Sequence, residues 1–292
     1  MKSLSVKGFD LVIISTTYCG KYVKIDPQSR VVAYCYTPFR LAWNPNSYPI
    51  YTNSKGILRY IFNTVISILR KIDQQESQKI NHFIAMTRET QQRLIESYKP
   101  ESYIPIINPS VELDNYELSK NIGDYYLIVS RLEPYKKVDL AIKAFNNSKR
   151  KLVVVGRGSM KGYLKSIAND NIVFHEMLSN SELAQLYKNC KGFVFPQYED
   201  YGLTPIEANA AGRPVIAFGK GGVLDTMIPY HKNQNKATAY FFYEQSVESL
   251  NEAITNFERL TFAPDVLRKN AERFSQERFK NELEAFIGQI MK

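Results

Sequence analysis

Three cations stand close together in the segment SRLEPYKKVDLAIKAF, which covers 130–145. They are Arg131, Lys136 and Lys137, and an expected helix follows them directly. A helix N-terminus carries partial positive charge, which disfavours cations there unless an anion binds. Arginine offers forked donors and lysine a compact charge, and the combination suits a diphosphate. A solvated loop is the alternative interpretation of these residues taken alone.

A second polar group opens the segment EDYGLTPIEANAAGRPVIAF, 199–218. An expected buried strand ends just before it and a helix follows. Gly202 lets the backbone approach a ligand closely, and the N–H groups from Gly202 through Leu203 to Thr204 would face an anion or a sugar at the helix N-terminus. Glu199 stands beside this turn, where its carboxylate could accept hydrogen bonds from sugar hydroxyls.

Glu207 follows Glu199 in a Glu-x7-Glu pattern and admits two interpretations. In the first, Thr204, Pro205 and Glu207 form a capping box with proline at the first helical position, worth about 1 kcal/mol to the helix. In the second, both carboxylates bind sugar hydroxyls across the turn. The residues alone leave both interpretations open.

These groups stand at the ends of expected strands. Apolar runs bounded by turn residues predict buried parallel strands at 125–130, 151–156, 171–176, 192–196 and 214–218. Helical patterns fall between them at 138–146, 160–168, 181–189 and 205–211. This alternation predicts a doubly wound α/β sheet, in which ligands bind beyond the carboxyl ends of the strands. Gly156, in the turn VVVGRGS after one strand, is a weak candidate, because a tight turn explains it equally well.

The first half predicts a thinner layer of strands at FDLVIIS, VVAYC, 81–85 and 103–107. The segment 108–124, with Pro109 and Gly123, is the expected linker. We therefore expect a first Rossmann-like domain at 1–112 and a second at 113–271. A last helix at 272–292 could return to the first domain.

Four segments together resemble the retaining glycosyltransferases of family four, which have the GT-B fold: SRLEPYKKVDLAIKAF, VVVGRGS, LSNSELAQLYKNCKGFVFP and EDYGLTPIEANAAGRPVIAFGKGG. The closest likeness is to bacterial-type mannosyltransferases of surface-polysaccharide and lipid-linked oligosaccharide assembly. The resemblance implies an α/β protein of two Rossmann-like domains with a cleft between them.

The resemblance also implies roles for individual residues. Arg131 and Lys136 would hold the donor diphosphate and offset the charge of the leaving group. Glu199 would lie by the donor sugar, and Glu207 would bind the ribose. The other donor-binding positions that it implies are Gly156, Gly202, Leu203, Thr204, and Met177 and Leu178, whose backbone would meet the base.

The first half departs from the family pattern in two ways. Tyr36, in CYTP, stands where the family usually has a histidine beside the reactive carbon of the donor sugar, and tyrosine does not titrate near neutrality. Roughly 80 to 100 residues of the usual first domain, judged against an ordinary domain size, are expected to be missing. A longer N-terminus or a separate partner chain would then complete that domain.

An amphipathic helix is expected at Lys55–Ile72, with apolar residues on one stripe and basic residues beside it. It is either a core helix of the first domain or an interfacial helix that lies on an anionic membrane surface near a lipid-linked acceptor. The net charge of +9, concentrated in the first 112 residues, agrees with the second interpretation. No nucleic-acid-binding signature accompanies the charge.

The resemblance thus implies a retaining hexosyltransferase. No Asp-x-Asp motif is present to hold a metal, so we expect the reaction to need neither a metal nor a cofactor. GDP-mannose is the favoured donor, by likeness, and a glycan or polyprenyl-linked molecule the acceptor. Three scattered cysteines favour a cytoplasmic protein. If the helix at Lys55–Ile72 is interfacial, the protein would lie peripherally on the inner face of the membrane. The alternatives are a catalytically silent nucleotide-sugar-binding subunit and a nucleotide-sugar hydrolase or epimerase.

Overall fold

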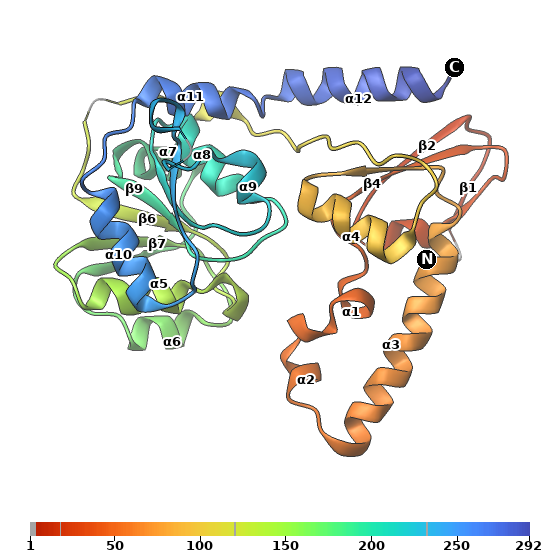
Figure 1. Ribbon diagram of the computed structural model, residues 1–292, viewed down its shortest axis with the longest axis horizontal. Helices are drawn as coiled ribbons and strands as arrows, with labels where there is room; N and C mark the ends of the chain where they lie inside the picture. Colours follow the sequence, from red (N-terminus) through yellow and green to blue (C-terminus); the bar gives the residue numbers. More distant parts are fainter. Residues whose placement is uncertain (1–3, 18, 120, 232) are drawn as a thin grey trace. The chain divides into compact units, whose positions relative to one another are not determined.

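The chain forms two compact units, 1–108 and 109–292 (Figure 1). The computed structural model describes residues 4–17, 19–119, 121–231 and 233–292. The sequence places the boundary at 112/113, a few residues later. Both units are α/β, and every strand pairing in them is parallel among the described residues.

The first unit is built on a three-stranded sheet in the order β2-β4-β5, at Leu11–Thr16, Arg30–Cys35 and His82–Ala85. Strands β1 (Ser5–Val6) and β3 (Lys24–Ile25) form a separate parallel pair. The helices of this unit are η1 Cys19–Tyr22, α1 Arg40–Trp43, η2 Pro45–Ser47, α2 Pro49–Thr52, α3 Gly56–Ser77 and α4 Arg88–Tyr98. Its core lies between the sheet and α4, where Phe83 and Leu94 are buried together.

The prediction of a strand at 103–107 is wrong. Only a single bridge forms there, between Ala85 and Ile106. Proline has no N–H to donate to a ladder, and Pro105 stands in the middle of this segment. Its carbonyl still accepts from the N–H of Ala85, at 2.9 Å. The run is extended but does not become a strand.

The last turn of α3 is anchored inside the first unit by a buried carboxylate, that of Asp73. The ammonium of Lys21 lies 2.8 Å from it, and the hydroxyls of Tyr22 and Tyr98 and the indole N–H of Trp43 all donate to it. A buried carboxylate is tolerated only when it is paired and hydrogen-bonded in this way. The C-terminal end of α3 is therefore fixed by contacts from η1, α1 and α4.

The second unit is built on a six-stranded sheet in the order β11-β10-β9-β6-β7-β8. Its strands are β6 Tyr125–Val129, β7 Lys151–Val155, β8 Ile172–His175, β9 Gly192–Phe195, β10 Val215–Phe218 and β11 Ala239–Phe242. Its helices are η3 Leu113–Asn115, η4 Pro134–Lys136, α5 Val138–Asn146, α6 Lys161–Ser166, α7 Asn180–Asn189, α8 Leu203–Ala210, α9 Val223–Thr226, η5 Gln234–Lys236, α10 Val247–Phe257, α11 Pro264–Glu272 and α12 Gln276–Ile290. All five strands and four helices predicted for this region are confirmed, within a few residues at their ends.

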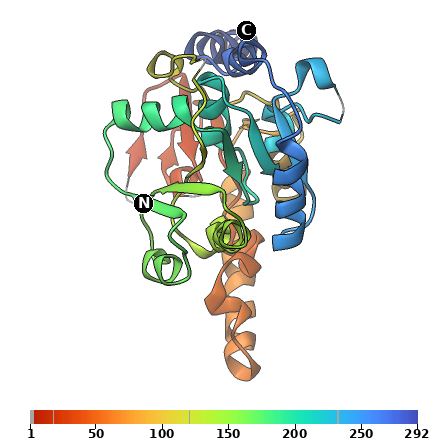
Figure 2. The ribbon, with the colours of Figure 1, turned by 90° about the vertical axis from the view of Figure 1, so that its left-hand side faces the viewer.

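Helices cover both faces of this sheet (Figure 1, Figure 2). Helices α5 and α10 pack together on one face, while α8 and α11 pack together on the other. From β6 the chain proceeds outward to β7 and β8, then returns to place β9 on the other side of β6. The strand order thus reverses between β6 and β9. In doubly wound sheets such a switch point is where ligands bind, beyond the carboxyl ends of the strands.

The expected helix at 272–292 is corrected at its start. Helix α11 ends at Glu272, and α12 begins only at Gln276. Ser275 stands between them, and its hydroxyl accepts from the N–H of Arg278 at 3.3 Å. A serine that caps a helix start in this way divides one apolar pattern into two helices.

Two arginines tie the expected linker to the second unit. Arg213, which is buried, donates to the carbonyls of Ser119 and Asn121. Arg268 donates to the carbonyls of Leu113 and Tyr116, at 3.2 and 2.8 Å. Lys120, also in the expected linker, lies outside the described residues. The segment after Asn108 is thus bound along its length to the unit that it precedes.

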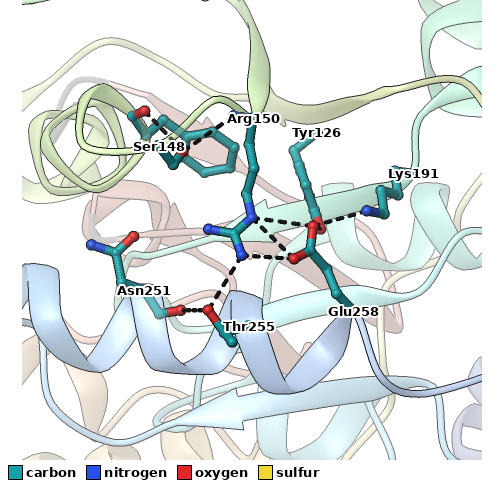
Figure 3. Close-up of polar contacts among 8 residues, drawn as sticks. Tyr126, Ser148, Arg150, Lys191, Asn251, Thr255 and Glu258 are labelled. Carbon is teal, nitrogen blue, oxygen red and sulfur yellow. Dashed lines mark hydrogen bonds and ion pairs between the residues drawn. The ribbon is translucent and has the colours of Figure 1, made fainter.

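At the amino ends of the strands, an ion-pair cluster joins the sheet to α10 (Figure 3). Glu258, just after α10, accepts three hydrogen bonds from Arg150 and forms an ion pair with Lys191 at 2.8 Å. The hydroxyl of Tyr126 also donates to it, at 3.0 Å. These donors come from the starts of β7, β9 and β6. None of the helices in the described parts of the chain is long and apolar enough to cross a membrane.

Candidate functional site

Two loops meet at the switch point of the second unit. One follows β6 and covers 130–137; we call it the cation loop. The other follows β9 and covers 196–202; we call it the carboxylate loop. Because β6 and β9 pair directly in the sheet, their carboxyl ends bring these two loops together. The chemistry that the sequence assigns to Arg131, Lys136 and Glu199 lies on them.

Tyr135 contacts two of the three cations of the cation loop, Arg131 and Lys136. Arg131 donates to its hydroxyl at 2.5 Å, with the guanidinium carbon 5.8 Å from the centre of the ring. The ammonium of Lys136 lies 5.3 Å from the centre of the same ring. Cations are attracted to an aromatic face at such distances. Arg131 and Lys136, five positions apart, are therefore held in one place.

An ion pair between Lys136 and Glu199 connects the two loops. The side chain of Lys136 is 11% exposed and that of Glu199 22% exposed, so both reach solvent only in part. Partial burial weakens solvent screening and strengthens the attraction between the two charges. A cation and a carboxylate are thus held side by side at the switch point.

Gln197 is a member of the site that the sequence did not reveal. It is 2% exposed, and its amide nitrogen donates to Glu199 at 3.4 Å. Its amide oxygen has no hydrogen-bond partner among the described residues. A buried acceptor without a donor is uncommon in folded proteins. No pattern marks Gln197 in the sequence, apart from its position two residues before Glu199.

Glycines of the segment after β10 hold the carboxylate loop in place. Gly221 has φ +83°, and a Cβ there would lie 2.3 Å from the carbonyl oxygen of Glu199. The N–H of Gly222 donates to that same carbonyl at 2.9 Å. Only glycine can adopt this backbone conformation so close to a neighbouring chain. The motif GKGG thus fixes the backbone of Glu199.

Gly156 packs closely against the backbone at the start of the cation loop. Its φ is +152°, and a Cβ would lie 1.8 Å from the carbonyl oxygen of Ser130. In the same turn, the carbonyl of Arg157 accepts from the N–H of Leu132 at 2.9 Å. The glycine is required because two strand ends approach each other here. Its predicted contact with the donor remains a prediction.

The structure corrects the capping box expected at Thr204, Pro205 and Glu207. Helix α8 begins at Leu203, with Gly202 at the N-cap in a left-handed conformation and no side chain capping the helix. Glu207 is the fifth residue of the helix rather than a member of its first turn. The turn forms because Gly202, at φ +91°, lies against the ring of Phe195, where a Cβ would come within 2.9 Å. No side chain therefore occupies the backbone N–H groups at the start of α8. The hypothesis that the N–H groups of Leu203 and Thr204 bind an anion requires this.

The carboxylate of Glu207 lies with two tyrosines instead. The hydroxyl of Tyr187, which is fully buried, donates to it at 2.7 Å, and Tyr116 in the linker donates to it as well. Burial raises the pKa of Glu207, and the two phenols act against that rise. The structure therefore joins Glu199 to Lys136 directly but anchors Glu207 between α7 and the linker.

The remaining predicted residues lie at other strand ends. Met177, after β8, has φ +51° and is 88% exposed, and Leu178 is partly buried beside it. Tyr36 belongs to the first unit, where it follows β4; its hydroxyl shares a 2.7 Å hydrogen bond with that of Ser15. A strained, exposed backbone at Met177 is compatible with contact to a base, which remains a prediction.

No group of three or more His, Cys, Asp or Glu side chains is placed to hold a metal ion in the parts of the chain that the structure describes. The expectation of metal-independent chemistry stays a prediction, which a chelator can test. The cations of the cation loop are the groups available to bind a diphosphate.

Comparisons with known proteins show which family and fold this chain resembles. Among curated relatives, the alpha-1,3/1,6-mannosyltransferase ALG2 of Saccharomyces cerevisiae is 24% identical over 289 residues, which cover 80% of this chain and 55% of the relative. The chain spans about half the length of such relatives. Sucrose-phosphate synthase from Thermosynechococcus elongatus superposes with a TM-score of 0.72 at 15% identity, covering 97% of this chain and 74% of that one.

A second solved structure, Anabaena Alr3699/HepE in complex with UDP, gives a TM-score of 0.68 at 14% identity, over 90% of this chain and 73% of the other. These likenesses show the GT-B fold. Residues 114–274, more than half of the chain, match the model of the family described as glycosyl transferases group 1. The chain therefore belongs to the glycosyl transferases group 1 family.

Proposed function

We propose that this chain acts as a retaining glycosyltransferase, moving a hexose from a nucleotide-diphosphate sugar to a glycan or lipid-linked acceptor. The observation that carries the proposal is the Lys136–Glu199 pair at the switch point of the second unit. It places one group suited to phosphate beside one group suited to sugar hydroxyls. Family membership supports the same reaction class.

In this proposal the cations act on the diphosphate. Lys136 and Arg131 neutralise the charge that grows on the leaving nucleoside diphosphate as its bond to the sugar breaks. Tyr135 holds both cations near their working positions before the donor arrives. Such preorganised charge costs no reorganisation at the moment of reaction.

The carboxylate loop acts on the sugar. Glu199, fixed by the glycines after β10, accepts hydrogen bonds from donor hydroxyls. The amide oxygen of Gln197 is a further acceptor for such a hydroxyl, since no described residue donates to it. Glu207, already held by two tyrosines, accepts from the ribose. The amides of Leu203 and Thr204 face the donor at the start of α8.

Retention follows from attack on the face that the leaving group departs. The bond between the anomeric carbon and the phosphate oxygen breaks, and the acceptor oxygen bonds to that carbon on the same face. The acceptor hydroxyl gives its proton to the departing phosphate. Within this scheme the protein supplies positioning and charge.

The favoured donor is GDP-mannose, because relatives such as ALG2 are named mannosyltransferases. Solved relatives are named as complexes with UDP or UDP-glucose, so a uridine donor is the competing choice. The proposal also includes a cytoplasmic location and a first unit that completes the acceptor side, with or without a partner chain.

A donor screen tests the proposal. Bound ligand raises the melting temperature by mass action, so the correct nucleotide sugar should give the largest shift. Labelled donor is then incubated with and without acceptor. Transfer only in the presence of acceptor supports the proposal. Release of free sugar alone indicates a hydrolase, and binding without any turnover indicates a silent subunit.

A further inference from the structure

Helix α3 exposes its most apolar face. Eight of its apolar residues occupy about 140° of the helix circumference at roughly 100° per residue: Ile57, Leu58, Ile61, Phe62, Val65, Ile68, Leu69 and Ile72. Within that stripe Ile57 is 79% exposed, Ile61 51% and Ile68 54%. The sequence leaves open whether this stripe packs in a core. None of its residues belongs to the core of the first unit. We call it the apolar stripe of α3.

A different side of α3 packs against the rest of the first unit, and it contains the buried Ile66, which is 5% exposed. Arg59 donates to the backbone of Thr52 and stacks on Tyr51, with the guanidinium carbon 4.1 Å from the ring centre. Arg70 donates to the carbonyl of Ala42 at 2.9 Å. A soluble helix ordinarily turns its apolar stripe inward and its charges outward. Here α1 and α2 contact Arg59 and Arg70, while most of the apolar stripe remains exposed.

Helix α2 adds to this surface. Its Tyr51 donates to Asn63 of α3 at 2.9 Å, so the two helices are joined near the start of α3. Ile50, beside that tyrosine, is exposed. Figure 1 shows α2 and the N-terminal half of α3 extending beyond the strands of the first unit. The apolar stripe is therefore presented on a projection, anchored at its far end by Asp73.

The charge around the stripe selects its partner. Residues 27–72 contain no Asp or Glu but six cations, Arg30, Arg40, Lys55, Arg59, Arg70 and Lys71. Lys55 precedes the helix and Lys71 borders the stripe, and both are exposed. A second copy of this surface would bring like charges together, which disfavours self-association. A partner with a negatively charged surface and an apolar interior fits both the cations and the apolar stripe.

We propose that the apolar stripe of α3, together with Ile50 of α2, inserts into the interface of an anionic lipid bilayer. The isoleucines enter the boundary between head groups and acyl chains, while Lys55 and Lys71 contact lipid phosphates. The helix lies in the membrane plane. The proposal concerns the first unit alone and does not depend on the donor chemistry proposed for the second.

Vesicle sedimentation tests it with the full chain. The vesicles are phosphatidylcholine mixed with phosphatidylglycerol, and phosphatidylcholine alone. Wild type should bind the anionic vesicles several-fold more strongly, and high salt should weaken that preference because it screens charge over roughly 10 Å or less. The double variant Ile61→Gln with Ile68→Gln should lower the partition coefficient about tenfold or more.

The matched control is Asn63→Gln with Ser67→Gln, which places the same two side chains at exposed positions of α3 on the side away from the stripe. It should bind vesicles like wild type, within about twofold, as expected when no apolar area is lost. Circular dichroism and melting temperature show that both variants are folded. Absence of binding to anionic vesicles at low salt overturns the proposal. Equal binding by the two double variants does so too, and a dimer that only the isoleucine variant disrupts would assign the stripe to a second copy.

Discussion

At the residue scale, the site depends on which side chains contact one another. The sequence does not indicate all of these contacts. Arg131, Lys136 and Glu199 could be selected because their types suit a diphosphate and a sugar. Tyr135 and Gln197 could not, because their roles arise from contacts with those residues in the folded chain. A tyrosine in a loop or a glutamine after a strand carries no signal of its own. The true partners of Glu207 were also hidden, since Tyr187 stands twenty positions away.

Lys136 gives the sharpest test of the donor site. Lys136→Ala should lower kcat/KM by about 10² to 10³, the range found when one preorganised charge-stabilising donor is removed. Circular dichroism and melting temperature of the variant are measured alongside, because Glu199 loses its partner in a pair that is only 11% and 22% exposed. Lys143→Ala, which removes an exposed lysine of α5 outside the cation loop, is the matched control and should keep nearly full activity. Unchanged turnover in Lys136→Ala would remove this residue from the diphosphate site.

Glu207 is no longer a candidate helix cap, so its substitution now distinguishes ribose binding from anchoring. If its carboxylate binds the ribose, Glu207→Gln should weaken nucleoside diphosphate affinity about tenfold, since charged hydrogen bonds are worth roughly 1.5–3 kcal/mol. Tyr187→Phe removes one phenol donor but keeps the charge, and should weaken binding less. Calorimetric titration measures both. Equal affinity in wild type and Glu207→Gln would leave only an anchoring role.

At the scale of elements, the second unit was predicted well because its strands are buried on both faces. A continuous apolar run such as KLVVV, with a helical pattern before and after it in the sequence, then indicates a buried parallel strand. Where tertiary contacts decide, the pattern was insufficient. One proline reduced the segment 103–107 to a bridge, and one serine separated α11 from α12. The stripe of α3 was recognised as apolar, but periodicity does not say which neighbour covers it.

The junction of α10 with the sheet predicts a dependence of stability on pH. Arg150, Lys191 and Tyr126 lower the pKa of Glu258 from 4.5 to about 2. A carboxylate whose pKa is depressed in the folded state contributes stability that is present above its unfolded pKa. That contribution is lost as pH falls from 4.5 toward about 2, where the folded protein takes up the proton.

Melting temperature measured from pH 7 down to pH 2 tests this junction. Glu258→Gln should be less stable than wild type at pH 7, and the difference should shrink below pH 4.5 as wild type loses the charge. Glu252→Gln, on the exposed side of α10, is the control and should follow wild type. A constant difference between wild type and Glu258→Gln across this range would mean that the ion pairs contribute nothing specific.

At the scale of the whole molecule, the residues of the proposed donor site, Tyr36 apart, all lie in the second unit. The GT-B fold and the family could be predicted from sequence because four motifs with fixed spacing all fall in the second unit, where the family model also matches. The first unit has fewer such motifs, and Tyr36 alone does not define a sugar site. Its contribution to catalysis has to be measured rather than deduced from motifs.

The last prediction follows from this division. Residues 109–292 contain the cation loop, the carboxylate loop, the glycines that fix them and the linker that Arg213 and Arg268 hold. A unit of this size with its own core should fold alone. We therefore expect the fragment 109–292 to bind the nucleoside diphosphate with nearly the affinity of the full chain.

Transfer should differ, because it requires an acceptor positioned against the donor, and positioning contributes much of the rate. The fragment should show no transfer under conditions in which the full chain, or the full chain with added partner, is active. Calorimetry on both proteins measures binding, and labelled donor measures transfer. Lys136→Ala in the fragment serves as the control, since it should lose affinity there as it does in the full chain. A folded fragment that fails to bind the nucleotide would show that the donor site needs residues of the first unit, and the switch-point loops alone would then not account for donor recognition.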